Sequence, residues 1–277
     1  MSVVIVVTNF SGSSRNALDY TCAFLHNPKS QVLLLNIYSF SSLFTNDAMA
    51  IAAMSETIAN DESKLQAEYE WAKANYPEIN IRTEMVSGTF MEVLRQKEKE
   101  EETALVVMGA GGNYADLLSW DVNIIDAFVD LVTPVLVIPS TRKFRPVQRI
   151  AFAVNYYRKN LEAPVAKIKR LIQYTQAQLY LINVVALTEI INEEALNSKR
   201  QLQEELAELS PEYFEPAFAN IFIAIDDFTQ AKNIDILIVI PTRHGIWYNI
   251  FQQSHTKGLV YLNHIPVLSL RQQGQFI

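Results

Sequence analysis

The sequence predicts two consecutive α/β domains, each with a doubly wound, five-stranded and mainly parallel sheet. Three observations indicate this fold class. The 277 residues are too many for one average domain and suit two domains of roughly 140 residues. Short continuous runs of Val, Ile and Leu, typical of parallel strands buried on both faces, alternate with helical stretches. Several of these runs also recur in the second half of the chain.

The repeated runs are the strongest internal signal. Residues 31–37 resemble residues 178–184, and both runs carry asparagine at their sixth position, Asn36 and Asn183, 147 residues apart. Residues 134–138 resemble 266–270, but at an offset of 132 residues. The second half is therefore interpreted as a copy that has lost about 15 residues in its middle.

Each half is expected to follow the same order of elements. In the first half we expect strands at 3–7, 32–37, 80–86, 104–108 and 134–138, and helices at 13–25, 46–75 and 90–99. In the second half we expect strands at 150–154, 179–185, 219–225, 236–240 and 266–270, and helices at 163–174, 189–209 and 227–231. Alternation of this kind indicates βαβ units.

A short boundary separates the two halves. Residues 139–148 contain Pro139, Pro146 and several cations, a composition that suits an exposed linker. The expected domains are therefore residues 1–140 and residues 147–277.

Composition excludes several classes of protein. The net charge of −7 and the pI of about 5.2 disfavour a nucleic-acid partner. Cys22 is the only cysteine and lies in an apolar helical stretch, so we expect a buried structural thiol and a reducing, cytoplasmic location. Residues 3–7 form an apolar run too short to span a bilayer, and no other run is long enough, so no membrane partner is expected. The four histidines show no metal-binding spacing.

Ligands of open α/β sheets bind beyond the carboxyl ends of the strands. In the first half those positions are Thr8, Asn9 and Phe10, then Asn36, then residues 109–113. The last stretch contains three glycines before a helix, an arrangement whose backbone N–H groups can hold a phosphate. The alternative is a tight turn that needs glycine only for positive φ.

At this point the chain resembles the universal stress protein family. The resemblance rests on Val-Val-Met-Gly at 106–109, on Gly112, on Pro-Val-Leu-Val-Ile-Pro at 134–139 and on the opening strand and helix. It implies an adenine-nucleotide-hydrolase-like, Rossmann-like fold in both halves. It also implies ATP, with Mg²⁺, as the ligand of the first half. Gly109 and Gly112 match the family's Gly-x-x-Gly, and Val122 and Asn123 fall at or next to its second phosphate motif.

Two departures weaken the implied first-half site. Asp121 stands where the family has glycine, and a carboxylate ~4 Å from a phosphate costs about 4 kcal/mol at an effective dielectric of ~20. A bridging Mg²⁺ could invert that sign. Asn9 replaces the family's acidic residue after the first strand, although an amide can still hydrogen-bond a base or a ribose.

The second half departs further from the family. Pro241 replaces the first glycine and removes a backbone donor. The remaining candidates there are Asn155 after the first strand, Ser254 at the hydroxyl position, and a basic group: Arg243, His244 and His255. These residues could hold an anion; the alternatives are a solvated loop or a contact with the other domain.

Two functions follow from these observations. The first is a stress-response regulatory protein that binds ATP or a related nucleotide in its first half, with slow hydrolysis at most. The second is a nucleotide-free interaction module whose phosphate loops have decayed. No nucleophile, acid or base is placed by spacing, so an enzyme is not expected. In the family two such domains associate through their final strands, which implies an internal pseudo-dimer here. A homodimer of the whole chain is left open, since no residue pattern indicates one.

Overall fold

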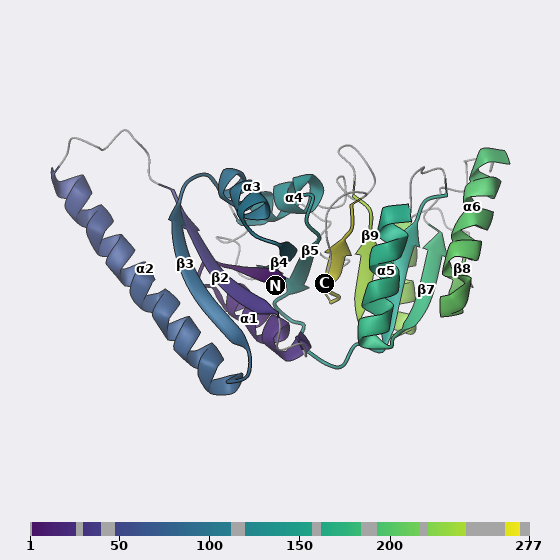
Figure 1. Cartoon of the computed structure of the whole chain (residues 1–277), viewed down its shortest axis with the longest axis horizontal. Coiled ribbons are helices and arrows are strands. Elements are labelled where there is room, and N and C mark those ends of the chain that lie inside the picture. Colours follow the sequence, from purple (N-terminus) through teal and green to yellow (C-terminus); the bar gives the residue numbers. More distant parts are fainter. Residues whose placement is uncertain are drawn as a thin grey trace.

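The computed structural model describes residues 2–25, 30–39, 48–111, 120–156, 162–183, 193–215, 221–241 and 264–271. Its centre is one ten-stranded sheet in the order β3-β2-β1-β4-β5-β10-β9-β6-β7-β8 (Figure 1). The first five strands are β1 Val3–Thr8, β2 Gln31–Tyr38, β3 Asn80–Ser87, β4 Thr103–Ala110 and β5 Val135–Pro139. The others are β6 Arg149–Val154, β7 Gln178–Asn183, β8 Glu212–Phe214, β9 Ile236–Val239 and β10 Val267–Ser269.

The sheet consists of two parallel five-stranded units. Within each unit every strand pair is parallel. The units meet where β5 pairs with β10 in antiparallel fashion, Leu136 opposite Leu268. Each unit extends in both directions from its first strand, which is the doubly wound arrangement. The predicted fold class is confirmed.

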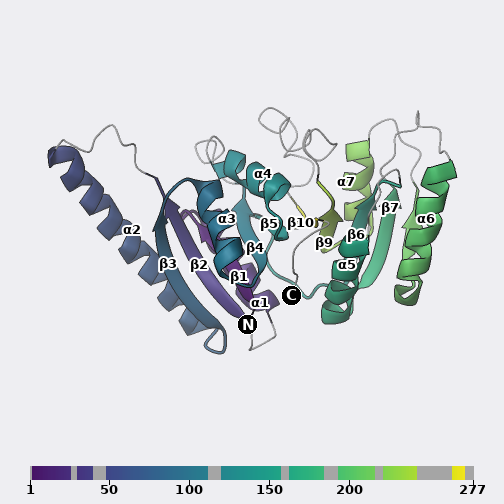
Figure 2. The same ribbon diagram turned by 45° about the horizontal axis from the view of Figure 1, so that its top comes forward.

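Helices cover both faces of the sheet (Figures 1 and 2). They are α1 Gly12–Phe24, α2 Ala48–Asn75, α3 Phe90–Glu100, α4 Trp120–Asp130, α5 Glu162–Thr175, α6 Glu193–Leu206 and α7 Ile221–Ala231, with a 3₁₀ turn at Ala207–Leu209. In the first half α1 contacts α2 and α3 contacts α4, one pair on each face. The two faces have separate apolar cores: alternate residues of β1 face each one, Val4 and Val6 one core, Ile5 and Val7 the other.

One strand prediction is wrong. Residues 219–225 were expected to form the third strand of the second half, but α7 begins at Ile221 and continues through the predicted helix 227–231. The strand is the short β8, which pairs with β7. The β-branched composition of the run favoured a strand, whereas Ala224, Ile225 and Phe228 are buried at helical spacing, so packing overrode propensity.

A buried carboxylate ties the linker to the second half. Asp235, just before β9, is 3% exposed. It accepts hydrogen bonds from Arg142 Nη2 at 3.0 Å and Arg145 Nε at 2.5 Å. It also accepts from the backbone N–H groups of Gln148 and Arg149, at 2.9 and 3.0 Å. Four donors therefore converge on one side chain and hold the linker against the start of β9.

Candidate functional site

The crevice expected at a switch of strand order lies between β1 and β4, because the chain winds in opposite directions from β1. Val7 pairs with Met108, so the residues after each strand lie side by side at the carboxyl edge. The structure thus brings together two of the predicted groups, Thr8 to Phe10 and Gly109 to Gly111. Asn36 is next to them, since Thr8 pairs with Asn36 in β2.

The loop after β1 is closed by its own hydrogen bonds. Thr8 Oγ1 accepts from the N–H of Phe10 at 3.0 Å. Asn9 Oδ1 accepts from the N–H and the hydroxyl of Ser11, at 3.1 and 2.6 Å. Phe10 has φ of +63°, a left-handed conformation that bulky residues rarely adopt. Asn9 therefore uses its carbonyl oxygen to shape the turn that starts α1.

A carboxylate from α2 reaches this edge and was not predicted. Glu68 is 6% exposed, and its Oε2 accepts a hydrogen bond from Thr8 Oγ1 at 2.9 Å. Burial raises the pKa of Glu68, and the hydrogen bond from Thr8 and the nearby Arg15 oppose that rise. The only signal in the sequence was its spacing, because Glu68 falls on the same helical face as the buried Leu65 and Ala72.

Asn36 carries an unused acceptor. Its Nδ2 donates to the carbonyl oxygen of Thr8 at 3.0 Å, which fixes the orientation of the amide. Its Oδ1 is buried and has no hydrogen-bond partner among the described residues. Asn183, at the end of β7, has a buried Oδ1 in the same condition. An unpaired buried acceptor costs about 1–3 kcal/mol, so such an atom needs a donor from beyond the described residues, such as a ligand or a water.

Gly109, near the carboxyl end of β4, and Gly111, just after the strand, are explained by different structural requirements. A Cβ on Gly109 would lie 2.1 Å from the carbonyl oxygen of Ser13, so glycine here allows the start of α1 to approach β4. Gly111 has φ of +81°, the positive φ that the tight-turn interpretation of this stretch requires. Close helix packing and turn geometry therefore explain both glycines without a phosphate.

The remaining predicted site residues are only partly placed. Asn123 is half-buried in α4, and Val122 lies in the same helix, after Asp121. Asn155 directly follows β6. Gly112, Arg243, His244, Ser254 and His255 lie outside the described residues. Within the described part of the chain, no group of three or more His, Cys, Asp or Glu side chains could hold a metal ion.

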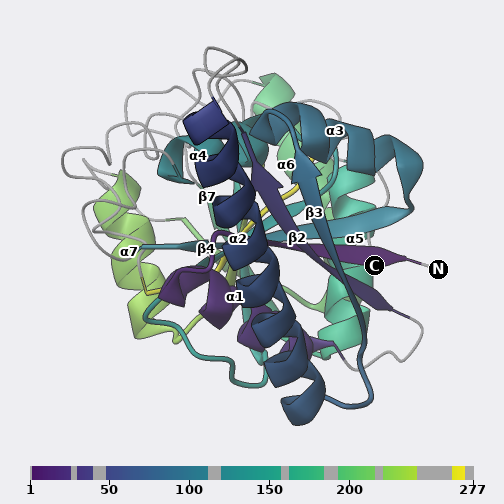
Figure 3. The ribbon, with the colours of Figure 1, turned by 90° about the vertical axis from the view of Figure 1, so that its left-hand side faces the viewer.

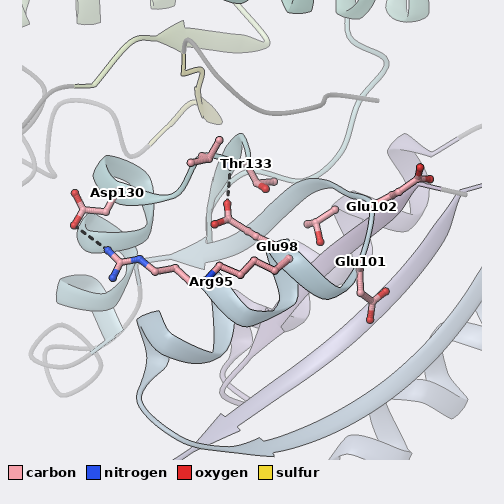
Figure 4. Close-up of a pocket in the computed structure, with 9 residues that line it drawn as sticks. Arg95, Glu98, Glu101, Glu102, Asp130 and Thr133 are labelled. Carbon is pink, nitrogen blue, oxygen red and sulfur yellow. Dashed lines mark hydrogen bonds and ion pairs between the residues drawn. The ribbon is translucent and has the colours of Figure 1, made fainter.

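A depression of about 540 Å³ lies at the opposite edge of the sheet (Figure 4). Its lining includes Glu98, Asp130 and Thr103, the residue that begins β4. Glu98 accepts from the N–H of Thr133 at 2.6 Å, and Asp130 lies 3.8 Å from Arg95. These groups are paired with one another, and the depression is remote from the crevice between β1 and β4.

Lys167 in α5 is a buried cation whose effect on the pH dependence of stability can be tested. It is 4% exposed, and its Nζ donates to the carbonyl oxygen of Arg271 at 3.0 Å. Burial lowers its pKa from 10.5 to about 8. Because the folded pKa is the lower one, the unfolded chain binds more protons between these values, and this residue makes the free energy of unfolding rise with pH across that window.

The matching experiment is urea unfolding of the wild type and of a Lys167→Met variant from about pH 7 to about pH 10. We expect the stability of the wild type relative to the variant to increase with pH. A difference that stays constant over the range would contradict the burial of a charged amine.

The geometry defines a Rossmann-like α/β protein with two parallel five-stranded units joined edge to edge. Residues 1–120 match the model of the Universal stress protein family. The resemblance predicted from the sequence is therefore confirmed over that stretch. No protein in the search of curated sequences matches the chain significantly.

Solved structures share the fold of the whole chain. A universal stress protein from Archaeoglobus fulgidus is 16% identical with a TM-score of 0.67, over 97% of this chain and 96% of that one. A putative universal stress protein from Pseudomonas aeruginosa is 15% identical with a TM-score of 0.53, over 97% and 92%. The cytoplasmic domain of a prokaryotic cation chloride cotransporter is 10% identical with a TM-score of 0.51, over 98% and 95%. No helix in the described residues is long and apolar enough to cross a membrane.

Proposed function

We propose that this chain is a stress-response regulatory protein whose first half binds an adenine nucleotide at the carboxyl edge between β1 and β4. The match of residues 1–120 to the universal stress protein family supports the stress-response role. The observation that carries the ligand is the buried Oδ1 of Asn36 beside this crevice, which has no hydrogen-bond partner in the described part of the chain. A base amino group or a ribose hydroxyl would supply the missing donor.

The rest of the edge suits binding better than catalysis. The sheet order places Thr8 and Asn36 on one side of the crevice and Gly111 on the other. The carboxylate that contacts Thr8 is that of Glu68, which is buried and already accepts a hydrogen bond from the Thr8 hydroxyl. It is poorly placed to activate a water, so hydrolysis of a bound nucleotide would be slow at most.

A second candidate function is a nucleotide-free interaction module. The closed loop of Asn9 and the close packing of Gly109 on Ser13 favour it, because both features leave less backbone for a phosphate. Asp121 in α4 favours it as well, since its charge would repel a phosphate. The fold shared with the cytoplasmic domain of the cotransporter is compatible with this role.

Isothermal titration of the purified chain with ATP and Mg²⁺ tests the proposal, with AMP as the comparison ligand. We expect one saturable site that weakens at least about tenfold in an Asn36→Ala variant, since a hydrogen bond to a buried ligand is lost. The matched control is Asn183→Ala, which removes the corresponding oxygen from the second half. Circular dichroism confirms that both variants are folded.

The outcomes separate the two candidates. No heat with millimolar ATP on a folded sample rules out the nucleotide site. In that case an Asp121→Gly variant that gains ATP affinity identifies the site as a decayed one. Binding that survives Asn36→Ala but is lost in Asn183→Ala would place the ligand in the second half.

A further inference from the structure

The side chains of Thr8 and Asn36 lie on the face of the sheet that α1 and α2 cover. Val6 of β1 and Leu34 of β2 belong to the core that also contains residues of these two helices. Because successive strand residues alternate between the faces, Thr8 and Asn36 are the next residues on that same face. Figure 3 shows α2 running across the front of the molecule with α1 next to it. The polar groups that end β1 and β2 therefore meet the two helices.

Glu68 is the carboxylate that α2 contributes to this face, and its hydrogen bonding is incomplete. Its Oε2 accepts from Thr8 Oγ1 at 2.9 Å, but that hydroxyl also lies 3.1 Å from Ser14 Oγ, so two acceptors share one proton. Among the described residues Glu68 has no ion pair, and its other oxygen, Oε1, accepts no hydrogen bond. Arg15, the cation whose charge acts on Glu68, has its guanidinium 4.2 Å from the centre of the Trp71 ring.

The contact with Thr8 does not by itself account for a charge at position 68. Glu68 is buried, and taking a carboxylate out of water disfavours its charged form unless hydrogen bonds replace the lost hydration. A neutral amide of the same shape would accept the proton of Thr8 as well. The charge is instead explained by a further donor, one that the described residues do not supply.

We propose that Glu68 determines the specificity of the nucleotide site at this edge, with its Oε1 accepting a hydrogen bond from a ribose hydroxyl of the ligand. The inference rests on the proposed function, in which an adenine nucleotide lies beside Thr8 and Asn36. Two acceptors are then available to the nucleoside, the neutral Oδ1 of Asn36 and the charged Oε1 of Glu68. They differ in charge, so they suit different donors of the ligand.

The chemistry of the two acceptors assigns the two kinds of donor that adenosine carries. A hydroxyl forms a short hydrogen bond with a carboxylate, about twice as strong as one between neutral groups. An acidic side chain is also the usual partner of a ribose hydroxyl in dinucleotide-binding sheets of this class. Glu68 is therefore matched to the ribose, which leaves Asn36 for the amino group of the base. A ribonucleotide should then be preferred over a deoxyribonucleotide.

Titration calorimetry with ATP, 2′-deoxy-ATP and 3′-deoxy-ATP, each with Mg²⁺, tests this assignment. The wild type should bind ATP about tenfold more tightly than at least one of the two analogues, because that analogue lacks the donor to a buried charge. Glu68→Met keeps the length of the side chain and removes both acceptors. In this variant ATP affinity should fall about tenfold and the preference for ATP should disappear. A purely structural role would weaken all three ligands equally and leave their ratios unchanged.

A Glu68→Gln variant separates the charge from the shape of the side chain. Its amide oxygen still accepts from Thr8, so without ligand its urea unfolding midpoint should be no lower than that of the wild type. Its affinity for ATP should nevertheless fall about fivefold, because a neutral acceptor replaces a charged one. The matched control is Glu70→Gln, which alters an exposed carboxylate of α2 that accepts from Gln66 and should change neither measurement.

The outcomes distinguish this assignment from the nucleotide site itself. A folded wild type that binds no ATP would overturn both. Binding of ATP and the two analogues with equal affinity, or a preference for ATP that persists in Glu68→Met, would overturn only the assignment of Glu68. A Glu68→Gln chain that loses stability and keeps its full ATP affinity would do the same, because the carboxylate would then serve the fold alone.

Discussion

An Asp235→Ala variant should lose about 3–5 kcal/mol of unfolding free energy, because removing one partner of a buried ion pair leaves the other uncompensated. Asp235 accepts hydrogen bonds from Arg142 and Arg145 and from two backbone N–H groups. The Arg142 side chain is only 19% exposed, and burial lowers its pKa. Without the carboxylate, Arg142 and the N–H groups of residues 148 and 149 lose their shared acceptor.

Urea unfolding followed by circular dichroism measures this loss. The matched control is Asp61→Ala, which removes an ion pair with Lys64 on the exposed surface of α2 and should cost about 0.5 kcal/mol or less. A variant in which Arg142 and Asp235 are both replaced by leucine should recover part of the stability, because the cation that it leaves without a carboxylate, Arg145, is 46% exposed and can be hydrated. Equal small losses for Asp235→Ala and Asp61→Ala would show that the linker is not held by this carboxylate.

Most of the fold was predictable because most of its strands are continuous apolar runs, which are the simplest pattern to recognise in a sequence. Continuous Val, Ile and Leu runs identify buried parallel strands, and the recurrence of Asn36 as Asn183 identifies two halves. The third strand of the second half was missed because β8 has only three residues and is stabilised by pairing with β7 rather than by its own composition. An edge strand of this kind has no periodicity to detect.

The candidate site was predictable only in its location. The topology rule placed Thr8, Asn36 and Gly109 at one edge, and they do lie there. The roles of individual side chains could not be predicted, since they depend on contacts between distant segments. Glu68 reaches Thr8 across 60 residues of chain, and Asp235 binds a linker about 90 residues away.

Gly109 fits two interpretations, a phosphate loop and close helix packing, which the sequence alone cannot distinguish. A glycine after the fourth strand fits a phosphate loop by sequence, whereas the structure places it against the backbone of Ser13. Under the packing interpretation a Gly109→Ala variant loses stability, because the added Cβ would lie 2.1 Å from a carbonyl oxygen. Overpacking of this kind costs about 3 kcal/mol where the backbone cannot move away.

Gly12 provides the matched control for that prediction. It is the first residue of α1, one position before Ser13, and a Cβ there meets nothing within 4 Å. Gly12→Ala should therefore keep the wild-type stability or gain up to about 1 kcal/mol, because alanine restricts the unfolded chain. Thermal and urea unfolding of both variants measures their stability, and titration of each with ATP and Mg²⁺ measures their nucleotide affinity. Together these measurements distinguish the two interpretations of Gly109. A Gly109→Ala protein as stable as the wild type that has lost nucleotide affinity would show that this glycine serves the ligand. A destabilised Gly109→Ala beside an unaffected Gly12→Ala would show that it serves the approach of α1 to β4.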